Sequence, residues 1–384
     1  MYGREDSEFT TMMKILTIFG TRPEAIKLAP VIKELQKSPL IESRVCVTAQ
    51  HREMLDQVLE VFHIVPDCDL DIMHEDQSLF DITSCALRLL EDVLKEEGPD
   101  IVLIQGDTTT AFVASLAAYY LKIKIGHVEA GLRTADKFNP FPEEINRRLV
   151  DVLSDLWFAP TQKAKANLLR EGFPSGNIFV TGNTVIDALF FTLNREVPIA
   201  RQQWLSDLGL SRGDSRLILV TGHRRESFGE GFKQICYGLQ KIAEHNKDLQ
   251  IVYPVHLNPR VQEPVHRILG GIENISLIEP LDYERFVWLM NQCYLVLTDS
   301  GGIQEEASSL GKPILVMREK TERPEAVEAG IARLVGTDCD KIFTETQRLL
   351  DNPAIYEKMG KAISTFGDGR AAERIVEILL NHVK

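Results

Sequence analysis

The chain has 384 residues, with 43 Lys and Arg against 56 Asp and Glu, and a formal net charge of −13. At about 100–200 residues per domain, this length predicts two domains. The hydrophobic fraction of 44% and the charged fraction of 26% are those of an ordinary globular protein. An acidic chain lacks the basic surface that non-specific binding of nucleic acid or anionic membrane requires. We therefore expect neither as a partner, and a few local cations must hold any anionic ligand.

The chain ends and the cysteines predict a cytoplasmic protein. Residues 1–12 carry several charges and no apolar signal core, so we expect a disordered tail before a folded chain that starts at residue 13. The longest apolar run, 111–121, is shorter than the roughly 18 residues of a membrane span. The six cysteines show no CxxC and no Cys/His cluster. They are expected to be buried, reduced thiols, and no metal is predicted.

Short apolar runs alternate with longer amphipathic segments along the whole chain, which is the pattern of βα units in parallel sheets. The strands predicted in the first half are 14–19, 44–48, 101–105, 123–128, 156–159 and 178–181. Those predicted in the second half are 217–221, 250–253, 275–278, 295–298, 314–316 and 332–334. Several are almost wholly apolar, as expected where helices cover both faces of a sheet.

The two halves repeat one pattern. The first strand of each half ends in a glycine and a basic loop, Gly-Thr-Arg from residue 20 and Gly-His-Arg from residue 222. Each half is therefore predicted to begin a Rossmann-like sheet, with domains at 13–182 and 183–368. Ligands of open α/β sheets bind outside the carboxyl ends of the strands. We expect an α/β fold in which two Rossmann-like domains face a central cleft.

The loop after the first strand favours an anion over a dinucleotide. It has only Gly20 where the GxGxxG fingerprint has three glycines, so bound NAD is not expected and no cofactor is predicted. Pro23 suits the first turn of a helix. Arg22 and Lys27 would then lie near a helix N-terminus, where anions are favoured. The alternative is that both cations are ordinary surface residues.

Three further segments supply carboxylates. Asp107 follows strand 101–105, where it either caps the next helix or meets a ligand. His127 and Glu129 alternate at the end of strand 123–128, so their side chains point to one side, which favours a functional role. Glu143 begins a predicted helix, where it either pairs with Arg147 at i,i+4 or acts as a third carboxylate.

In the second half, the run Thr-Asp-Ser-Gly-Gly at 298–302 joins a strand to a helix. Its glycines expose backbone N–H groups at a helix N-terminus, which suits a phosphate or diphosphate. Glu306, further along the helix, could accept hydrogen bonds from a ribose diol. The alternative is an ordinary helix start. His223 and Arg323 lie on loops at the same kind of strand end.

Eleven motifs occur in order from residue 19 to residue 326: FGTRPEAIK, TAQHREML, QGDTTT, GHVEAGLRT, FPEEINRR, TGNTVIDAL, TGHRRES, YPVHLNP, EPLDYERF, TDSGGIQEEA and REKTERPEA. Together they resemble bacterial UDP-N-acetylglucosamine 2-epimerases of the non-hydrolysing type. The resemblance implies a glycosyltransferase-B-like fold, a homodimer, and a C-terminal helix at about 369–384 packed on the N-terminal domain. It also implies reversible C2 epimerisation of UDP-N-acetylglucosamine to UDP-N-acetylmannosamine. UDP would leave through a 2-acetamidoglucal intermediate and then add back, in support of cell-surface polysaccharide synthesis.

The resemblance also implies site residues. The catalytic residues that it implies are Asp107, Glu129, Glu143 and His223. The contacts to substrate or UDP that it implies are Arg22, Lys27, Arg147, Phe286, Ser300, Gly301, Gly302, Glu306 and Arg323. Arg147 is expected to orient Glu143. Which carboxylate removes the C2 proton and which returns it is left open.

Gln50 and His51 match a segment that binds a second, regulatory substrate molecule in some family members. Glu53 and Asp76 stand where some of those members have Gln and Arg. Two extra acids beside an anionic effector would weaken its binding. We therefore expect a candidate regulatory site without substrate activation.

Three other functions fit the same motifs. A hydrolysing relative would release free N-acetylmannosamine and UDP. A glycosyltransferase on the same fold would need an acceptor site and would not exchange the C2 proton. A nucleotide-sugar sensor would bind without turnover and would tolerate replacement of Glu129 and Glu143 by Gln.

Overall fold

The computed structural model describes residues 12–49, 52–73, 77–195, 203–204, 216–361 and 365–382. Residue contacts divide the chain into two units: residues 1–188 together with 369–384, and residues 189–368. The expected N-terminal tail lies outside the described residues as far as residue 11. The boundary expected after residue 182, and the cleft expected between the domains, stay predictions.

The first unit is built on a seven-stranded parallel sheet with the order β3-β2-β1-β4-β5-β6-β7. Its strands are β1 (Met13–Phe19), β2 (Ile41–Val47), β3 (Cys68–Asp69), β4 (Ile101–Gln105), β5 (Lys124–Val128), β6 (Leu156–Ala159) and β7 (Ile178–Val180). The six predicted strands are all present. The short β3 was not predicted, because two residues are too few to show a hydrophobic period.

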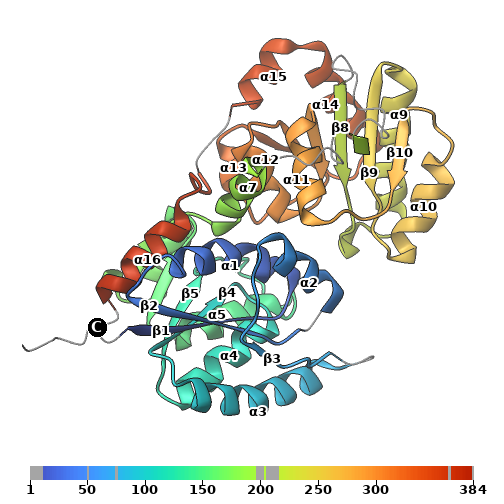
Figure 1. Ribbon diagram of the computed structural model, residues 1–384. Coiled ribbons are helices and arrows are strands. Elements are labelled where there is room, and N and C mark those ends of the chain that lie inside the picture. Colours follow the sequence, from blue (N-terminus) through green and yellow to red (C-terminus); the bar gives the residue numbers. More distant parts are fainter. Residues whose placement is uncertain are drawn as a thin grey trace, which may run out of the picture. The chain divides into compact units, whose positions relative to one another are not determined.

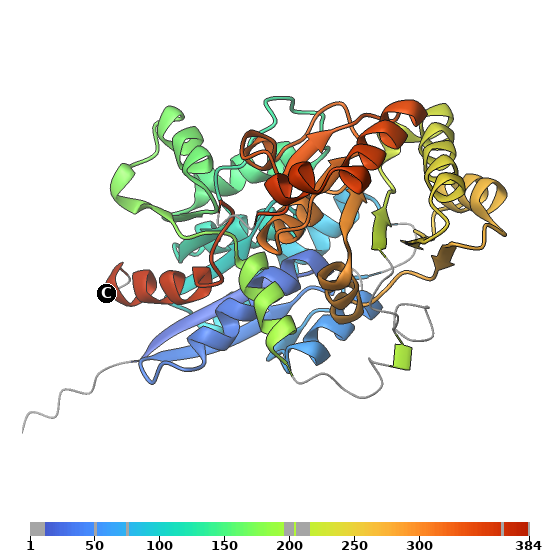
Figure 2. The same ribbon diagram turned by 90° about the horizontal axis from the view of Figure 1, so that it is seen from above.

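Helices cover both faces of this sheet (Figure 1). Those that lie wholly within the first unit are α1 (Arg22–Leu35), α2 (Arg52–Val61), α3 (Leu79–Glu97), α4 (Thr109–Tyr120), α5 (Glu143–Leu153), α6 (Gln162–Arg170) and α16 (Ala371–His382), with a 3-10 turn, η1 (Ser175–Asn177), whereas α7 (Thr184–Asn194) spans the division between the two units after residue 188. Helix α1 packs with α2 and α16, whereas α3, α4 and α5 pack together. The Ala372 amide donates to Asp187 Oδ1 at 2.8 Å, which attaches α16 to this unit. Figures 1 and 2 show α16, the red helix at the end marked C, beside the blue α1.

The second unit has a six-stranded parallel sheet with the order β10-β9-β8-β11-β12-β13. Its strands are β8 (Arg216–Thr221), β9 (Leu249–Pro254), β10 (Ile275–Ile278), β11 (Leu295–Thr298), β12 (Ile314–Val316) and β13 (Ala332–Leu334). Its helices are α9 (Glu230–His245), α10 (Pro259–Leu269), α11 (Tyr283–Gln292), α12 (Gly301–Ser309), α13 (Pro324–Glu328), α14 (Cys339–Asp351) and α15 (Pro353–Met359), with a 3-10 turn, η2 (Arg225–Ser227).

Both sheets have the same topology. Counted from its own first strand, each has the order 3-2-1-4-5-6, to which the first unit adds β7. The strand order therefore reverses between β1 and β4 in the first unit and between β8 and β11 in the second, and such switch points are where open α/β sheets bind ligands. The two Rossmann-like α/β units predicted from the alternating pattern are confirmed.

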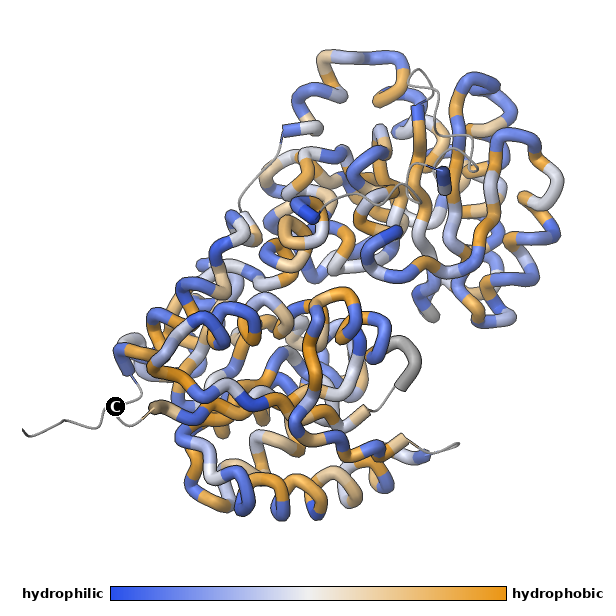
Figure 3. The backbone as a smooth tube through the Cα atoms, in the orientation of Figure 1, coloured by the Kyte–Doolittle hydropathy of each residue, from blue (hydrophilic) through white to orange (hydrophobic). Residues whose placement is uncertain are grey.

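Each sheet is buried between its helices. Ile15, Leu16 and Ile18 of β1 are fully buried, as are Ile218 and Val220 of β8. In Figure 3 the tube alternates between orange and blue along α3, as expected for a helix with one face on the core. Among the described residues, no helix combines the length and the apolar character that crossing a bilayer requires.

Candidate active site

The loop after β1 leads directly into a helix, as predicted. Helix α1 begins at Arg22 with Pro23 in its first turn. Gly20 is required there, because a Cβ at this position would collide with the side chains of Thr48 and Thr110. The loop therefore sets Arg22 at the N-terminus of α1, beside the β1/β4 switch point.

Glu129 and Lys27 are brought together in the first unit. Glu129 follows β5 with a φ of 67° and is buried. Its carboxylate forms an ion pair with Lys27 of α1 and accepts a hydrogen bond from the Gln105 amide. Asn183 Nδ2 donates to its other oxygen at 3.1 Å. Gln105 and Asn183 were not predicted as site residues, although both lie in motifs that the sequence shows.

Asp107 does not cap α4, so the structural alternative for this residue is wrong. Thr108 is the cap, and its hydroxyl accepts a hydrogen bond from the Ala111 amide at 3.0 Å. The Asp107 carboxylate instead forms an ion pair with Arg147 of α5, and Asn146 Nδ2 donates to the Asp107 carbonyl at 3.0 Å. Two contacts from α5 therefore fix Asp107 on the loop after β4.

Glu143, at the start of α5, is not the partner of Arg147. Arg147 contacts Asp107 and, at 3.3 Å, the Glu144 carboxylate. This differs from the expected orientation of Glu143, because Glu144 is the fully buried acid and its carboxylate faces the guanidinium. The Oε2 atom of Glu143 is buried without a hydrogen-bond partner among the described residues.

His127 is a structural histidine, which corrects the functional interpretation of its position. Its ring is fully buried, with Nδ1 2.7 Å from Asp151 Oδ1 and Nε2 2.8 Å from the Gly106 carbonyl. Asp151 also pairs with Arg133 at 2.8 Å. Because Gly106 immediately precedes Asp107, the buried ring fixes the loop that carries Asp107.

Glu24 joins two loops of the site and was not predicted. Its Oε2 accepts hydrogen bonds from the Gly20 and Thr21 amides at 3.1 and 2.8 Å, and its Oε1 accepts one from the Thr108 hydroxyl at 2.7 Å. Burial raises the pKa of Glu24, and these hydrogen bonds oppose that rise. The T-x-x-E spacing of a capping box, Thr21 to Glu24, was the signal that could have found it.

In the second unit, the Ser-Gly-Gly run forms the predicted helix start. Ser300 is the N-cap of α12, and its side chain makes no capping hydrogen bond. Gly301 and Gly302 are the first two helical residues, and a Cβ on Gly302 would have open space around it. Gln304 Nε2 donates to the Ser300 carbonyl at 3.0 Å and so fixes the turn. The N–H groups of this first turn are suited to bind an anion.

The other predicted nucleotide contacts lie around α12. Glu306 is buried and accepts a hydrogen bond from the Tyr283 hydroxyl of α11 at 2.9 Å. Phe286, one turn further along α11, is half-buried. Arg323 forms an ion pair with Glu305, the buried neighbour of Glu306. Neither Glu305 nor Tyr283 was predicted as a site residue, although both lie in motifs that the sequence shows.

His223 lies on the loop after β8, next to the β11 loop. Its side chain is 44% exposed, which excludes a core histidine. The ring stacks on that of His256, with centroids 5.2 Å apart and planes 8° apart. Partial removal of the ring from water lowers the pKa of His223, as do the nearby His256 and Arg224, while Asp299 opposes the shift.

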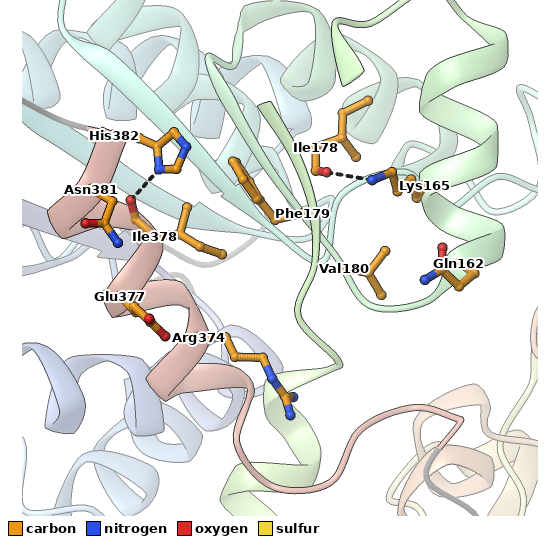
Figure 4. A pocket seen from close by; sticks show the side chains of 10 residues that line it. All are labelled: Gln162, Lys165, Ile178, Phe179, Val180, Arg374, Glu377, Ile378, Asn381 and His382. Carbon is orange, nitrogen blue, oxygen red and sulfur yellow. Dashed lines mark hydrogen bonds between the residues drawn. The ribbon is translucent and has the colours of Figure 1, made fainter. Parts of the chain in front are cut away.

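A cavity of about 430 Å³ lies elsewhere in the first unit, between β7, α6 and α16 (Figure 4). Lys165 Nζ donates to the Ile178 carbonyl at 3.1 Å, and His382 Nδ1 lies 2.9 Å from the Ile378 carbonyl. Arg374 donates to the Thr181 carbonyl at 2.9 Å. None of the predicted site residues lines this cavity.

The fold and these side chains define an α/β protein with two Rossmann-like units. The strand ends of the first unit carry two carboxylates paired with cations, the buried Glu129 and the half-buried Asp107, and those of the second carry a histidine and a helix N-terminus suited to an anion. The part of the chain that the structure describes holds no cluster of three metal-ligating His, Cys, Asp or Glu side chains. The candidate regulatory residues Gln50 and His51 lie outside the described residues, as does Asp76, and nothing is described of the Glu53 side chain.

Comparison with known proteins identifies the family. The family model described as UDP-N-acetylglucosamine 2-epimerase matches residues 33–380. The UDP-N-acetylglucosamine 2-epimerase of Salmonella typhimurium is 56% identical over 96% of this chain and 99% of its own. The crystal structure of UDP-GlcNAc 2-epimerase from Neisseria meningitidis, bound to UDP-GlcNAc, is 51% identical. It covers 96% of this chain and 100% of its own, with a TM-score of 0.92.

The enzyme from Methanocaldococcus jannaschii, in complex with UDP-GlcNAc and UDP, is 36% identical over 96% of this chain and 100% of its own, with a TM-score of 0.80. The chain therefore belongs to the UDP-N-acetylglucosamine 2-epimerase family. The family resemblance predicted from the eleven motifs is confirmed.

Proposed function

We propose that this enzyme interconverts UDP-N-acetylglucosamine and UDP-N-acetylmannosamine by eliminating UDP and adding it back. The C2 proton of the sugar is not acidic, because C2 is not next to a carbonyl group. When the C1–oxygen bond breaks, positive charge develops at C1 and acidifies that proton. Its removal leaves a 2-acetamidoglucal and free UDP in the site. Returning a proton to the opposite face of C2, with re-addition of UDP at C1, gives the epimer.

The observation that carries this proposal is the set of carboxylates at the ends of β4 and β5. Glu129 and Asp107 each have a cation of their own, Lys27 and Arg147, from different helices. A Cβ on Gly106 would lie 3.8 Å from Glu129 Oε2, so the Glu129 carboxylate lies against the loop that carries Asp107. Acid and base groups within reach of one carbon are what proton removal and return require.

Glu143 supplies the third acid. One of its oxygens is buried without a partner in the described chain, which is costly for a carboxylate unless a ligand or a proton satisfies it. A substrate hydroxyl or the transferred proton would meet that need. We assign the proton transfers at C2 to this set of Asp107, Glu129 and Glu143, with Arg22 and Lys27 facing the anionic part of the substrate.

The second unit is proposed to hold UDP. The first turn of α12 at Ser300, Gly301 and Gly302 offers backbone N–H groups to the diphosphate, and Arg323 adds a cation. Glu306 accepts from the ribose diol beside Phe286. Relatives of known structure bind UDP-GlcNAc, or UDP-GlcNAc and UDP, which supports this assignment. Because the diphosphate leaves and returns, a fixed electrostatic hold on it is essential.

The test is proton NMR of the reaction with UDP-N-acetylglucosamine in D2O. We expect deuterium at C2 of both the recovered substrate and the product, since the abstracted proton exchanges with solvent. Recovered C2 without deuterium contradicts the proposal. Accumulating free UDP and N-acetylmannosamine would identify a hydrolase instead, and sugar transfer to an added acceptor without C2 exchange would identify a glycosyltransferase.

A homodimer is part of the proposal. Helix α5 exposes Ile145, Leu149 and Val152 to 39%, 40% and 67%, spaced so that they share one face. The same helix carries Glu143 and Arg147, so a second copy seated on this face would stabilise the site. Light scattering should show a dimer that Val152→Glu dissociates. A wild-type monomer would contradict the proposed homodimer.

We also propose that the product supplies cell-surface polysaccharide synthesis. A deletion strain that retains such polysaccharide would contradict that role.

A further inference from the structure

Asp299, in the segment between β11 and α12, is fully buried and held by the loop after β8. One of its oxygens, Oδ2, accepts hydrogen bonds from the His223 and Arg224 amides at 2.7 and 2.8 Å. Two donors on one oxygen leave the carboxylate little freedom to turn. The position of its second oxygen is therefore fixed as well.

That second oxygen, Oδ1, is buried and has no hydrogen-bond partner among the described residues. It lies 3.7 Å from Nδ1 of the His223 ring. Two nearby donors are already engaged: the Tyr253 hydroxyl donates to the Gly222 carbonyl at 2.9 Å, and the Ser300 amide donates to the Thr298 hydroxyl at 3.0 Å. A buried carboxylate oxygen without a donor is destabilising, and a small rotation of the His223 ring would satisfy it.

We propose that Asp299 is a positioning residue that keeps the proton of the neutral His223 ring on Nδ1, so that Nε2 faces the leaving diphosphate. The proposal deepens the proposed function and rests on His223 acting at the diphosphate. A ring nitrogen protonated against a carboxylate fixes both the orientation and the tautomer of a histidine. The Asp299 carboxylate also stabilises the imidazolium that forms when Nε2 gains a proton.

Among the described residues, three charged or titratable groups face the His223 ring: Asp299 from the β11 end, His256 from the β9 end and Arg224 from its own loop. Asp299 alone raises the pKa of His223, whereas His256, Arg224 and burial lower it. His256 Nδ1 lies 3.0 Å from the Asn258 amide as an acceptor, so this nitrogen carries no proton. The Asp299 carboxylate is therefore the group among them that favours a protonated His223.

Asp299→Asn keeps the shape of the side chain but puts a hydrogen-bond donor, opposite Nδ1 of His223, where Asp299 has an acceptor. The two amides of His223 and Arg224 need an acceptor, so the Asn oxygen must take the place of Oδ2. The Asn NH2 group then faces Nδ1 of His223 as a donor, which forces the proton onto Nε2. In a histidine–carboxylate pair of this kind, the wrong tautomer lowers kcat by up to about 10⁴-fold. We expect at least a roughly 100-fold loss of kcat.

The matched control is Glu24→Gln in the first unit. Glu24 also accepts two consecutive backbone amides on one oxygen, but its other oxygen bonds the Thr108 hydroxyl and faces no histidine. The same change from carboxylate to amide there should leave the tautomer of His223 unaltered. A loss of stability common to both variants reflects the replacement of a buried carboxylate, whereas a tautomer change confined to Asp299→Asn supports the proposal.

The experiment is 15N NMR of the histidine side chains, with the His223 signals assigned from the spectrum of a His223→Gln variant. In the wild-type protein we expect neutral His223 to carry its proton on Nδ1, and in Asp299→Asn on Nε2, with a lower pKa and a pH–rate limb moved to lower pH. Wild-type His223 protonated on Nε2 would overturn the proposal even if Asp299→Asn fails to fold. An unchanged tautomer in a folded Asp299→Asn protein would also overturn it. This readout needs no turnover, so it is independent of the D2O test of the proposed function.

Discussion

Each unit has a buried carboxylate that holds the loop at its switch point, and the two carboxylates differ in the hydrogen bonding of their second oxygen. In each, one buried carboxylate accepts two consecutive backbone amides of the loop after the first strand: Glu24 in the first unit and Asp299 in the second. The second oxygen of Glu24 accepts a hydrogen bond from the Thr108 hydroxyl at 2.7 Å. The second oxygen of Asp299 accepts none in the described chain and lies 3.7 Å from an imidazole.

This difference separates a structural role from a functional one. A fully satisfied buried carboxylate stabilises its surroundings and has no capacity left for chemistry. A half-satisfied one retains an interaction that forms when a partner ring turns or becomes charged. The same contrast separates Glu144, with several donors, from Glu143, with a buried and unpaired oxygen, on α5.

The largest expected effect is at Glu129. Glu129→Gln keeps the shape and the Asn183 contact but removes the negative charge and the base, so kcat should fall by about 10²–10⁴-fold. Because the change is confined to the first unit, UDP affinity should stay within about twofold. Calorimetric titration with UDP, alongside C2 exchange in D2O, measures both. Normal C2 exchange in this variant would show that the Glu129 carboxylate is not needed for the proton transfer.

Glu24 is expected to matter for stability. Glu24→Ala leaves the Gly20 and Thr21 amides and the Thr108 hydroxyl without an acceptor, at about 1–3 kcal/mol for each buried group left unpaired. We expect a total loss of about 3 kcal/mol after relaxation and water entry. Glu24→Gln, which keeps an acceptor oxygen, should lose less than half of that. Urea unfolding of the two variants measures the difference, and equal losses would show that Glu24 acts by its charge.

Among the described residues, Glu97 in the first unit and Glu322 in the second have strongly lowered pKa values. Hydrogen bonds from Arg44 at 3.0 Å and Lys14 at 2.7 Å, with the charges of both cations, outweigh burial and lower the pKa of Glu97 to about 2. Burial raises the pKa of Glu322, but the hydrogen bond and charge of Arg318 at 2.7 Å outweigh it and bring the pKa to about 2. The two carboxylates therefore stabilise the fold above about pH 4.5, and this stabilisation is lost as the pH falls towards 2.

Glu97→Gln and Glu322→Gln should each reduce the loss of stability that occurs as the pH falls from about 4.5 towards 2. After allowance for screening by solvent, each is expected to remove about 1 kcal/mol of stability at pH 7 and little at pH 2. Thermal unfolding midpoints measured between pH 7 and pH 2 would show it. A variant whose midpoint falls with pH as steeply as that of the wild-type protein would contradict the lowered pKa.

The smallest effect on stability is expected at Gly302. An added Cβ meets nothing within 4 Å, so Gly302→Ala should stabilise α12 slightly, by about 0.5 kcal/mol. If the diphosphate approaches this backbone, the same methyl group should weaken UDP binding about tenfold, which is about 1.4 kcal/mol. Thermal unfolding and UDP titration test the two effects separately. Unchanged UDP affinity would indicate that the diphosphate does not bind at the start of α12.

Most strands and the loops that follow them could be predicted from the sequence, because buried parallel strands are apolar runs and the loops after them carry glycines and charges. The Lys27–Glu129 pair follows from that placement. The Asp107–Arg147 pair could not be foreseen, since it depends on how α5 lies over the end of β4. His127 was misread because its alternation with Glu129 fixes only a direction, and the buried Asp151 behind it belongs to a segment 24 residues away.

The central step of the proposed reaction is the breaking of the C1–oxygen bond. The direct measurement uses UDP-N-acetylglucosamine that carries 18O in the bridge between C1 and the β-phosphorus. If UDP leaves and its terminal phosphate rotates before adding back, mass spectrometry or 31P NMR of recovered substrate will show the label in non-bridging positions. We predict this scrambling at a rate comparable to epimerisation. Epimerised product whose label remains wholly in the bridge would contradict elimination and require a different route to C2.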